Sequence, residues 1–302
     1  MRTHAGLEDS LRLSGLQLPE VCEDDASPGC IAAFSLCQTT TYRWSLTEDL
    51  VQYARSGIGS VGLYRPKVEE FDEDLAVDLI RSSNLSVSSL SWIGGFTGSD
   101  GNPQAEAMYD AREAMRFANA VDAGTIAIVT GGLGRHIGKQ ARRLMHDALR
   151  ELCDEAEMRD LRLALHPFSN PEMKSRTLIR SIRETLAVIN ELERAPLGLM
   201  LDLEELADDP DLSGALEQIA PLIHCVRIRD RRPRHGRRRL RLGERALGQA
   251  ALIRELLAAG YDGPFEFDLF SEQDRPVEQY EALIRECRLE FELFHSAIGL
   301  CS

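Results

Sequence analysis

Residues 197–206 read LGLMLDLEEL, an apolar run that is interrupted by an acid at Asp202. Short runs of this kind, almost continuously apolar, are typical of parallel strands that are buried on both faces. Three further runs also stop at a side chain that can do chemistry: LRLALHPF (161–168) at His166, IHCVRIRD (223–230) at Arg227, and GPFEFDLFS (263–271) at Asp268.

The same alternation of strand-like and helix-like segments extends over most of the chain. Helical patterns separate the strands, and one of them begins at a capping box formed by Ser45 and Glu48 and stops at Gly57. Another covers 177–192, where apolar residues recur at helical spacing. The predicted strands are IAAFSLC, SVGLY, LSVSSLSWI, TIAIVTG, LRLALHP, LGLMLDL, IHCVRIRD and FEFDLF.

Eight strands that are each followed by a helix predict an α/β protein with a single (β/α)8 TIM barrel. The barrel is expected over 29–302, with a short N-terminal extension over 1–28. A doubly wound open sheet is less favoured, because no Gly-rich turn follows IAAFSLC. In a barrel all strand C-terminal ends open on one face, so His166 and Asp202 should meet Arg227 and Asp268 there.

The composition indicates a soluble globular protein, since 43% of the 302 residues are hydrophobic and no window resembles a membrane span. Charges interrupt the N-terminal residues, which is unlike a signal peptide. The seven cysteines are scattered without a C-x-x-C pair, a pattern that favours reduced thiols and a cytoplasmic location. We therefore expect a small-molecule substrate and no membrane partner.

The net charge of −14 conceals a basic segment. Residues 227–245 contain ten arginines against two acids, while the rest of the chain is strongly acidic and should be repelled by nucleic acid. Because loops after strand 7 often bind phosphate in barrels, Arg229 and Arg231 are candidate substrate-binding residues. The alternatives are a solvated basic loop or a clamp on a neighbouring subunit of a homo-oligomer. Trp92, which ends predicted strand 3, and Arg135 and His136, which follow predicted strand 4, are further candidates.

The ending LLAAGYDGPFEFDLFS and the pairing of LMLDLEEL with HCVRIRDRR resemble the xylose isomerase-like barrels, which include sugar isomerases, epimerases and an endonuclease. The resemblance implies a metal site with a Glu after strand 5, an Asp on strand 6, a His on strand 7 and a Glu on strand 8. A further His follows the strand-6 acid. At these positions the chain has His166, Asp202, Arg227, Asp268 and Glu205, in that order.

Arg227 leaves three alternatives open, because a guanidinium has no lone pair to offer a cation. Arg227 could turn away, so that His166, Asp202, Asp268 and Glu205 hold Mn, Zn or Mg. It could supply the positive charge itself in a metal-free site, and it would then lie within hydrogen-bonding reach of Asp202 or Asp268. The site could also have lost its activity. Strand alternation places Glu266 on the same side as Asp268 but deeper, with an arginine as its expected partner.

The resemblance implies a sugar isomerase or epimerase that acts on a small sugar, keto sugar or polyol, with or without a phosphate group. His166 or Asp268 would move a proton next to a carbonyl, and Arg227 or a metal at Asp202 would stabilise the developing charge. The alternative function is a non-catalytic member of the same fold that binds a small anion. A nucleic-acid enzyme is disfavoured by the acidic surface and by the small number of histidines.

Overall fold

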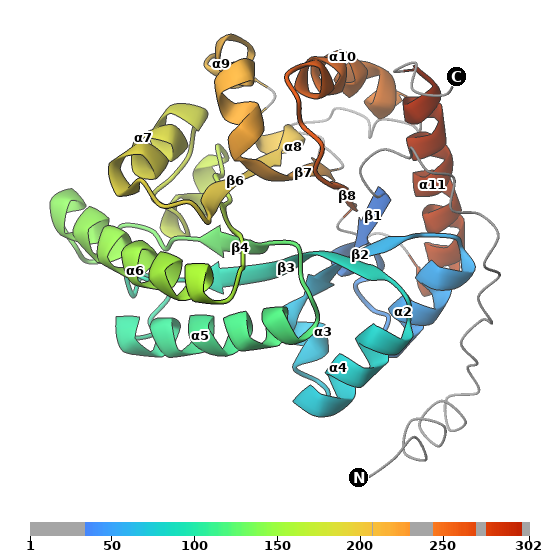
Figure 1. Cartoon of the computed structure of the whole chain (residues 1–302), viewed down its shortest axis with the longest axis horizontal. Helices are drawn as coiled ribbons and strands as arrows, with labels where there is room; N and C mark the ends of the chain where they lie inside the picture. The colour runs from blue at the N-terminus through green and yellow to red at the C-terminus, as the bar shows by residue number, and fades with distance from the viewer. Residues whose placement is uncertain (1–33, 207, 230–243, 270–275, 298–302) are drawn as a thin grey trace.

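The computed structural model describes residues 34–206, 208–229, 244–269 and 276–297. Within these ranges the strands form one closed, all-parallel barrel in the order β1 to β8, with β8 paired to β1 (Figure 1). The predicted fold class is therefore confirmed. The predicted N-terminal extension over 1–28 and Arg231 lie outside the described residues. The strands are β1 (Phe34–Cys37), β2 (Ser60–Tyr64), β3 (Ser86–Gly94), β4 (Ile126–Val129), β5 (Leu163–Leu165), β6 (Leu197–Asp202), β7 (Ile223–Arg229) and β8 (Phe265–Asp268).

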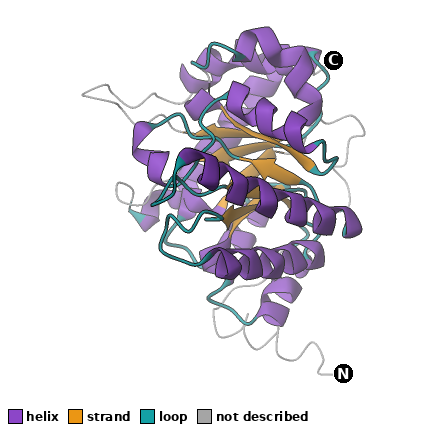
Figure 2. Cartoon of the chain, turned by 90° about the vertical axis from the view of Figure 1, so that its left-hand side faces the viewer, coloured by secondary structure: helices purple, strands orange, loops and turns teal. Residues whose placement is uncertain are grey.

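Helices surround the barrel on its outer side, so that the strands lie in the interior of the molecule (Figure 2). Several of these helices bury mostly apolar side chains and leave charged side chains exposed. The α-helices are α2 (Leu46–Arg55), α3 (Arg65–Val68), α4 (Glu73–Ser82), α5 (Gln104–Ala120), α6 (Gly138–Met158), α7 (Ile182–Leu192), α8 (Leu203–Leu206), α9 (Leu212–Ile219), α10 (Glu244–Ala258) and α11 (Tyr280–Ala297).

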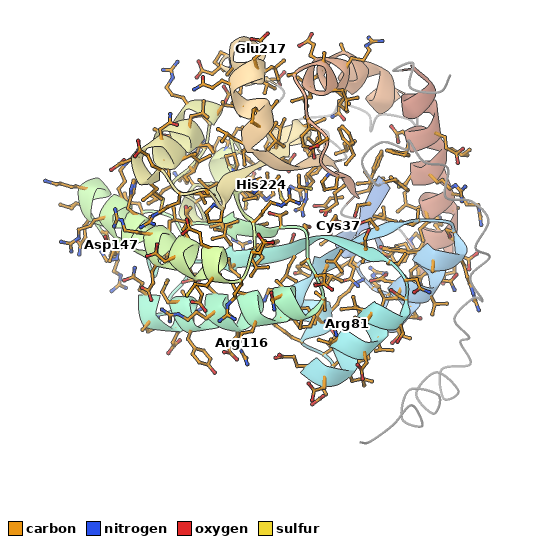
Figure 3. The ribbon with its side chains drawn as sticks, viewed as in Figure 1. Cys37, Arg81, Arg116, Asp147, Glu217 and His224 are labelled. Atoms are coloured by element: carbon orange, nitrogen blue, oxygen red, sulfur yellow. The ribbon has the colours of Figure 1, made fainter. Side chains whose placement is uncertain are left out.

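The outer faces of these helices are charged. Arg81, Arg116, Asp147 and Glu217 are exposed and point away from the barrel, whereas Cys37 lies among the strands (Figure 3). Within the described residues, no helix combines the length and the apolar character that crossing a membrane would require. The four described cysteines are all buried.

The predicted start of α2 is confirmed. The Ser45 side chain accepts from the Glu48 backbone, the Glu48 carboxylate accepts from the Ser45 backbone, and Gly57 follows the helix with a φ of +68°. The predicted start of α7 is wrong, because the helix begins at Ile182 and not near residue 177. Ser181 caps it by accepting from the Glu184 backbone. The preceding residues form a loop, in which Thr177 makes a bridge to Gly131.

The barrel interior is apolar on one side and polar on the other. Ala127, Ala164, Met200 and Cys225, from β4 to β7, form a small buried cluster against which Trp92 packs. Towards β1, β3 and β8 the interior instead contains buried serines and an acid, which are described with the site below. Barrel interiors are usually filled by layers of branched apolar side chains, so the polar part of this one needs a specific set of hydrogen-bonding partners.

A buried ion pair joins α2 to α3 beside the barrel. Lys67 Nζ contacts Asp49 Oδ2 at 2.6 Å, and both side chains are almost inaccessible to solvent. Thr41 and Gln38 donate to the same carboxylate at 2.5 and 3.0 Å, and Lys67 also donates to the carbonyl oxygens of Gln38 and Thr41. Burial raises the pKa of Asp49 to about 7, while Lys67 and the hydrogen bonds act in the opposite direction.

His224, on β7, is expected to make stability depend on pH. Burial and the nearby Arg162 lower the pKa of His224 to about 4, against an opposing hydrogen bond with the Leu163 backbone. The unfolded chain then binds a proton below pH 6.5 that the folded protein binds only near pH 4, so the free energy of unfolding should fall as pH drops through this window. The shift corresponds to a loss of up to about 3 kcal/mol. Urea unfolding at several pH values measures this dependence. In His224→Gln the free energy of unfolding should fall less steeply between pH 6.5 and 4 than in the wild type, and an equal fall in both proteins would contradict the assignment to His224.

Candidate active site

His166 and Asp202 form a hydrogen-bonded pair at the C-terminal ends of β5 and β6. His166 Nε2 lies 3.2 Å from Asp202 Oδ2, and both side chains are buried. The other oxygen, Asp202 Oδ1, accepts from the backbone N–H groups of Glu204 and Glu205 at 2.9 and 3.2 Å. Asp202 therefore ends a strand, holds the first residues of α8 and orients the imidazole.

Arg229 joins the two carboxylates at the rim of the barrel. Its Nη1 lies 3.5 Å from Asp202 Oδ2, and its Nε lies 3.2 Å from Asp268 Oδ2. The register of the sheet causes this contact, because Arg229 stands directly opposite Asp268 on β8. Its side chain is 23% exposed, whereas those of Asp202 and Asp268 are at most 3% exposed.

Arg227 lies one layer deeper, and its shortest ionic contact is with Glu266. Arg227 Nη2 is 2.5 Å from Glu266 Oε1 and 2.8 Å from Ser91 Oγ, while Nη1 is 3.6 Å from Asp268 Oδ2. Arg227 was expected within hydrogen-bonding reach of Asp202 or Asp268, but its contact with Asp268 is an ion pair at 3.6 Å, which is longer than a hydrogen bond. The side chain that bridges the two rim acids is Arg229, and the expected arginine partner of Glu266 is Arg227.

Glu266 has a partner for each of its oxygens inside the barrel. Ser88 and Ser89 donate to Oε2 at 2.8 and 2.6 Å, and Ser35 hydrogen bonds with Ser88. A Cβ at Gly62 would lie 2.3 Å from Glu266 Oε2, so β2 has room for this carboxylate only because residue 62 is glycine. Glu266 is fully buried and would be costly without these contacts.

Asp268 is also held by the 3-10 helix that follows β1 (Gln38–Thr41). The Thr39 hydroxyl donates to Asp268 Oδ1, and the same hydroxyl lies 3.0 Å from Cys37 Sγ. Burial, together with the negative charges of Asp268 and Glu266, raises the pKa of the Cys37 thiol, which keeps it neutral. We call the six side chains of His166, Asp202, Arg227, Arg229, Glu266 and Asp268 the ionic network.

The network sets the charge of its histidine. Burial lowers the pKa of His166 and the positive charge of Arg227 lowers it further, against the opposing hydrogen bond to Asp202. Burial alone would raise the pKa of Asp202, but Arg229 and His166 bring it below its ordinary value. At neutral pH the pair is therefore a neutral imidazole beside a carboxylate.

One nitrogen of His166 has no partner. In the described part of the chain, Nδ1 of His166 is a buried atom without a hydrogen bond, and the ring packs against Phe168 with centroids 4.2 Å apart. If Nε2 donates its proton to Asp202, Nδ1 carries the lone pair of the neutral ring. A substrate that reaches this nitrogen would meet a base whose orientation Asp202 fixes.

Trp92 is half-buried and belongs to a row of aromatic side chains. Its ring centroid lies 6.1 Å from that of Tyr64, which lies 6.0 Å from that of Tyr42. Arg176 lies over the indole, 5.3 Å from its centroid. The row follows the ends of β1, β2 and β3, and aromatic faces of this kind suit the apolar faces of sugars.

The other predicted substrate-binding residues lie elsewhere. Arg135 is exposed and is not among the described side chains that make up the ionic network. His136 is half-buried, and its Nε2 lies 2.9 Å from the carbonyl oxygen of Thr97, which fixes the loop after β3. Arg229 is the predicted substrate-binding residue that the structure brings into the network.

Glu205, the predicted fourth metal ligand, has a different set of contacts. Its Oε2 accepts from Ser169 Oγ at 3.1 Å and from the Asn170 backbone at 3.0 Å. These bonds tie α8 to the loop after β5. The carboxylate therefore holds that loop, and the contact of Glu205 with Asp202 is made by its backbone N–H, which donates to Asp202 Oδ1.

A divalent metal does not fit this arrangement. Every oxygen of Asp202, Asp268 and Glu266 already accepts a hydrogen bond or an ion pair, and two guanidinium groups lie among them. A positive unit charge about 4 Å from a guanidinium group is repelled by roughly 4 kcal/mol at an effective dielectric constant of 20. Among the described residues, no three His, Cys, Asp or Glu side chains are grouped so as to hold an ion.

Sequence reasoning missed the residues that support the network. Ser88, Ser89 and Ser91 hold Glu266 and Arg227, and Thr39 holds Asp268. The signal for the serines is present in SVSSLSWI, where hydroxyls recur in a strand that is otherwise apolar.

The fold and the position of the network define the class of protein: a closed α/β barrel with ionisable side chains gathered at the C-terminal ends of its strands. Residues 50–289 match the model of one family of such barrels, the xylose isomerase-like TIM barrel. The chain therefore belongs to the xylose isomerase-like TIM barrel family. A comparison with curated protein sequences gives no match.

Solved structures of similar fold cover most of the chain. A protein from Sinorhizobium meliloti 1021 has a TM-score of 0.75 and 22% identity, covering 85% of this chain and 97% of its own. An L-ribulose 3-epimerase has a TM-score of 0.71 and 17% identity, with coverages of 89% and 96%. The zinc-bound IolI protein also has a TM-score of 0.71 and 17% identity, with coverages of 88% and 98%. At these identities the likeness shows the fold alone.

Proposed function

We propose that this protein is an isomerase or epimerase that acts on a small sugar, keto sugar or polyol by moving a proton next to a carbonyl. The observation that carries the proposal is the His166–Asp202 pair, a neutral imidazole with one unpartnered nitrogen in a buried position. The family, which includes sugar isomerases and epimerases, supports the reaction type.

In this mechanism His166 Nδ1 accepts the proton from the carbon next to the substrate carbonyl. The electron pair of the broken C–H bond forms the C=C bond of an enediolate, and the carbonyl oxygen gains the negative charge. Arg229, the partly exposed cation of the network, stabilises this oxygen. In an isomerisation, the imidazolium returns the proton to the former carbonyl carbon, and the hydroxyl proton on the adjacent oxygen moves to the enediolate oxygen, so that a new carbonyl forms at the adjacent carbon. In an epimerisation, the proton returns to the opposite face of the same carbon after the intermediate has turned, and the original carbonyl forms again. Asp202 acts as a positioning residue, and the aromatic row with Trp92 contacts the sugar.

The test is solvent deuterium exchange into a panel of ketoses and aldoses, with and without added Mn²⁺. Deuterium should enter at least one substrate, and His166→Asn should lower the exchange rate by about 100-fold or more, as loss of a general base does. His136→Asn is the matched control, since its ring holds a loop after β3, and it should keep the wild-type rate. Absence of exchange in every substrate would contradict the proposal.

The pH profile offers a further prediction. Because the pKa of His166 lies below its ordinary value of 6.5, the base is unprotonated at neutral pH and the exchange rate should fall only on the acid side of 6.5. Measuring kcat/KM from pH 4 to 8 checks this. If kcat/KM already decreases at pH values well above 6.5 as the pH is lowered, the proton is transferred by another group.

A second function is favoured by one observation. The carboxylate oxygens of the network are all engaged, while Arg229 remains partly exposed. These contacts suit a non-catalytic protein that binds a small anion at Arg229. Calorimetric binding of an anion such as phosphate or a sugar acid, without exchange of any ligand proton, would support this function over the first.

A further inference from the structure

We propose that the guanidinium groups of Arg227 and Arg229 take the place that a divalent ion has in a xylose isomerase-like barrel, so that the network functions without a metal. This inference takes its site from the proposed function but does not depend on which substrate is turned over. It goes beyond the sequence-based alternatives because it assigns the charge to two arginines in different layers.

Strand pairing places both arginines beside acids. The two residues stand on β7 opposite the two acids of β8, with Arg227 paired to Glu266 and Arg229 paired to Asp268. Arg229 also reaches across to Asp202 on β6. The cationic centre between the acids of β6 and β8 is thus already occupied by a side chain.

The positive charge of both arginines is permanent. Neither arginine can become an acceptor, because a guanidinium has five donors and no lone pair to give. Carboxylate neighbours raise the pKa of both groups, with Glu266 acting most strongly on Arg227 and Asp268 on Arg229, against the effect of burial. To bind an ion, the acids would have to leave these partners, and two positive charges would remain beside it.

The shape of a guanidinium group also indicates which ligand it would bind. A guanidinium donates parallel N–H bonds in one plane and matches two oxygens that lie side by side. An α-hydroxycarbonyl group, its enediolate and a carboxylate each present such a pair. Arg229 is the member of the network that solvent reaches, so the oxygens of such a ligand would meet it first.

The experiment is calorimetric titration of the full chain with Mn²⁺ and Zn²⁺ after dialysis against a chelator, together with metal analysis of the purified protein. The wild type should carry no stoichiometric metal and bind neither ion specifically. The variant Arg227→His/Arg229→Ser restores a histidine on β7 and frees Asp202 and Asp268. It should bind Zn²⁺ at least about 100-fold more tightly than the wild type does.

A matched control removes two arginines from the surface instead. Arg183 and Arg285 are 79% and 66% exposed, and Arg183→His/Arg285→Ser makes the same change of residue types. It should bind no metal. Circular dichroism confirms that each variant is folded, and if the buried double variant is not, Arg229→Ser alone is titrated, with the same direction expected.

Stoichiometric metal in the wild type, or wild-type affinity equal to that of the folded buried variant, would overturn the inference. These outcomes are separable from those of the proposed function. Deuterium exchange in a metal-free buffer measures catalysis, whereas the titration measures the ion. Exchange that needs Mn²⁺ contradicts this inference and leaves the isomerase proposal standing.

Discussion

Replacing Arg227 by methionine is expected to lower the free energy of unfolding by about 3–5 kcal/mol, because the change leaves a buried carboxylate without its counter-charge. Glu266 is fully buried, and Arg227 Nη2 is its ionic partner at 2.5 Å. Methionine keeps much of the volume of the arginine stem, so the loss reports charge more than packing. Urea unfolding followed by circular dichroism measures it.

The double variant Arg227→Met/Glu266→Gln is the decisive control. It removes both charges and keeps an oxygen that can accept from Ser88 and Ser89. Most of the lost stability should return. Arg183→Met, on an exposed side chain, should change stability by no more than about 0.5 kcal/mol. A single Arg227→Met variant as stable as the wild type would show that the pair contributes nothing to the fold.

Replacing Lys67 by methionine should cost about 3 kcal/mol at neutral pH for the same reason, since Asp49 is fully buried and Lys67 Nζ contacts it at 2.6 Å. Without the ammonium group the pKa of Asp49 should rise further above about 7. Between pH 7 and 4 the Asp49 carboxyl is then protonated in the folded variant but ionised in the unfolded chain, where its pKa is the ordinary 3.8. The free energy of unfolding of the variant should therefore increase as pH falls from 7 towards 4.

This pH dependence separates charge from packing. Lys67→Met/Asp49→Asn lacks the titrating carboxyl and should not show the additional pH dependence of the single variant, while the volume changes little. Unfolding by urea at pH 7 and pH 5 compares the two variants. Equal pH dependence in both would mean that Asp49 is not the group responsible.

The fold could be predicted from the sequence because each strand is short, apolar and bounded by turn residues. The runs ending at His166 and Asp202 needed no partner to be recognised, since strands buried on both faces have this composition wherever they occur. The boundary of α7 was harder. The apolar spacing continues through residues 177–181, but the bridge from Thr177 to Gly131 and the Ser181 cap make the helix begin later in the chain, at Ile182.

The ionic network was only partly predictable. Strand alternation places Arg227 and Arg229 on one side of β7, and Glu266 and Asp268 on one side of β8, but it does not say which arginine meets which acid. That choice depends on the register between strands, and a shift of two residues would keep every side chain inside while exchanging partners. The row that joins Trp92 to Tyr64 and the pair of Asp49 and Lys67 likewise depend on contacts between distant segments.

The Arg227–Glu266 pair also bears on the order in which the chain can be built. During synthesis β7 leaves the ribosome before β8, so Arg227 is present while its acidic partner is still being made. Folding its guanidinium into the barrel at that stage would strip it of water without compensation. We therefore expect Arg227 to stay hydrated in a nascent chain of seven strands and to be buried once Glu266 is present. The expected consequence is that Arg227 becomes buried together with Glu266 when β8 pairs with β7 and β1, the step that closes the ring.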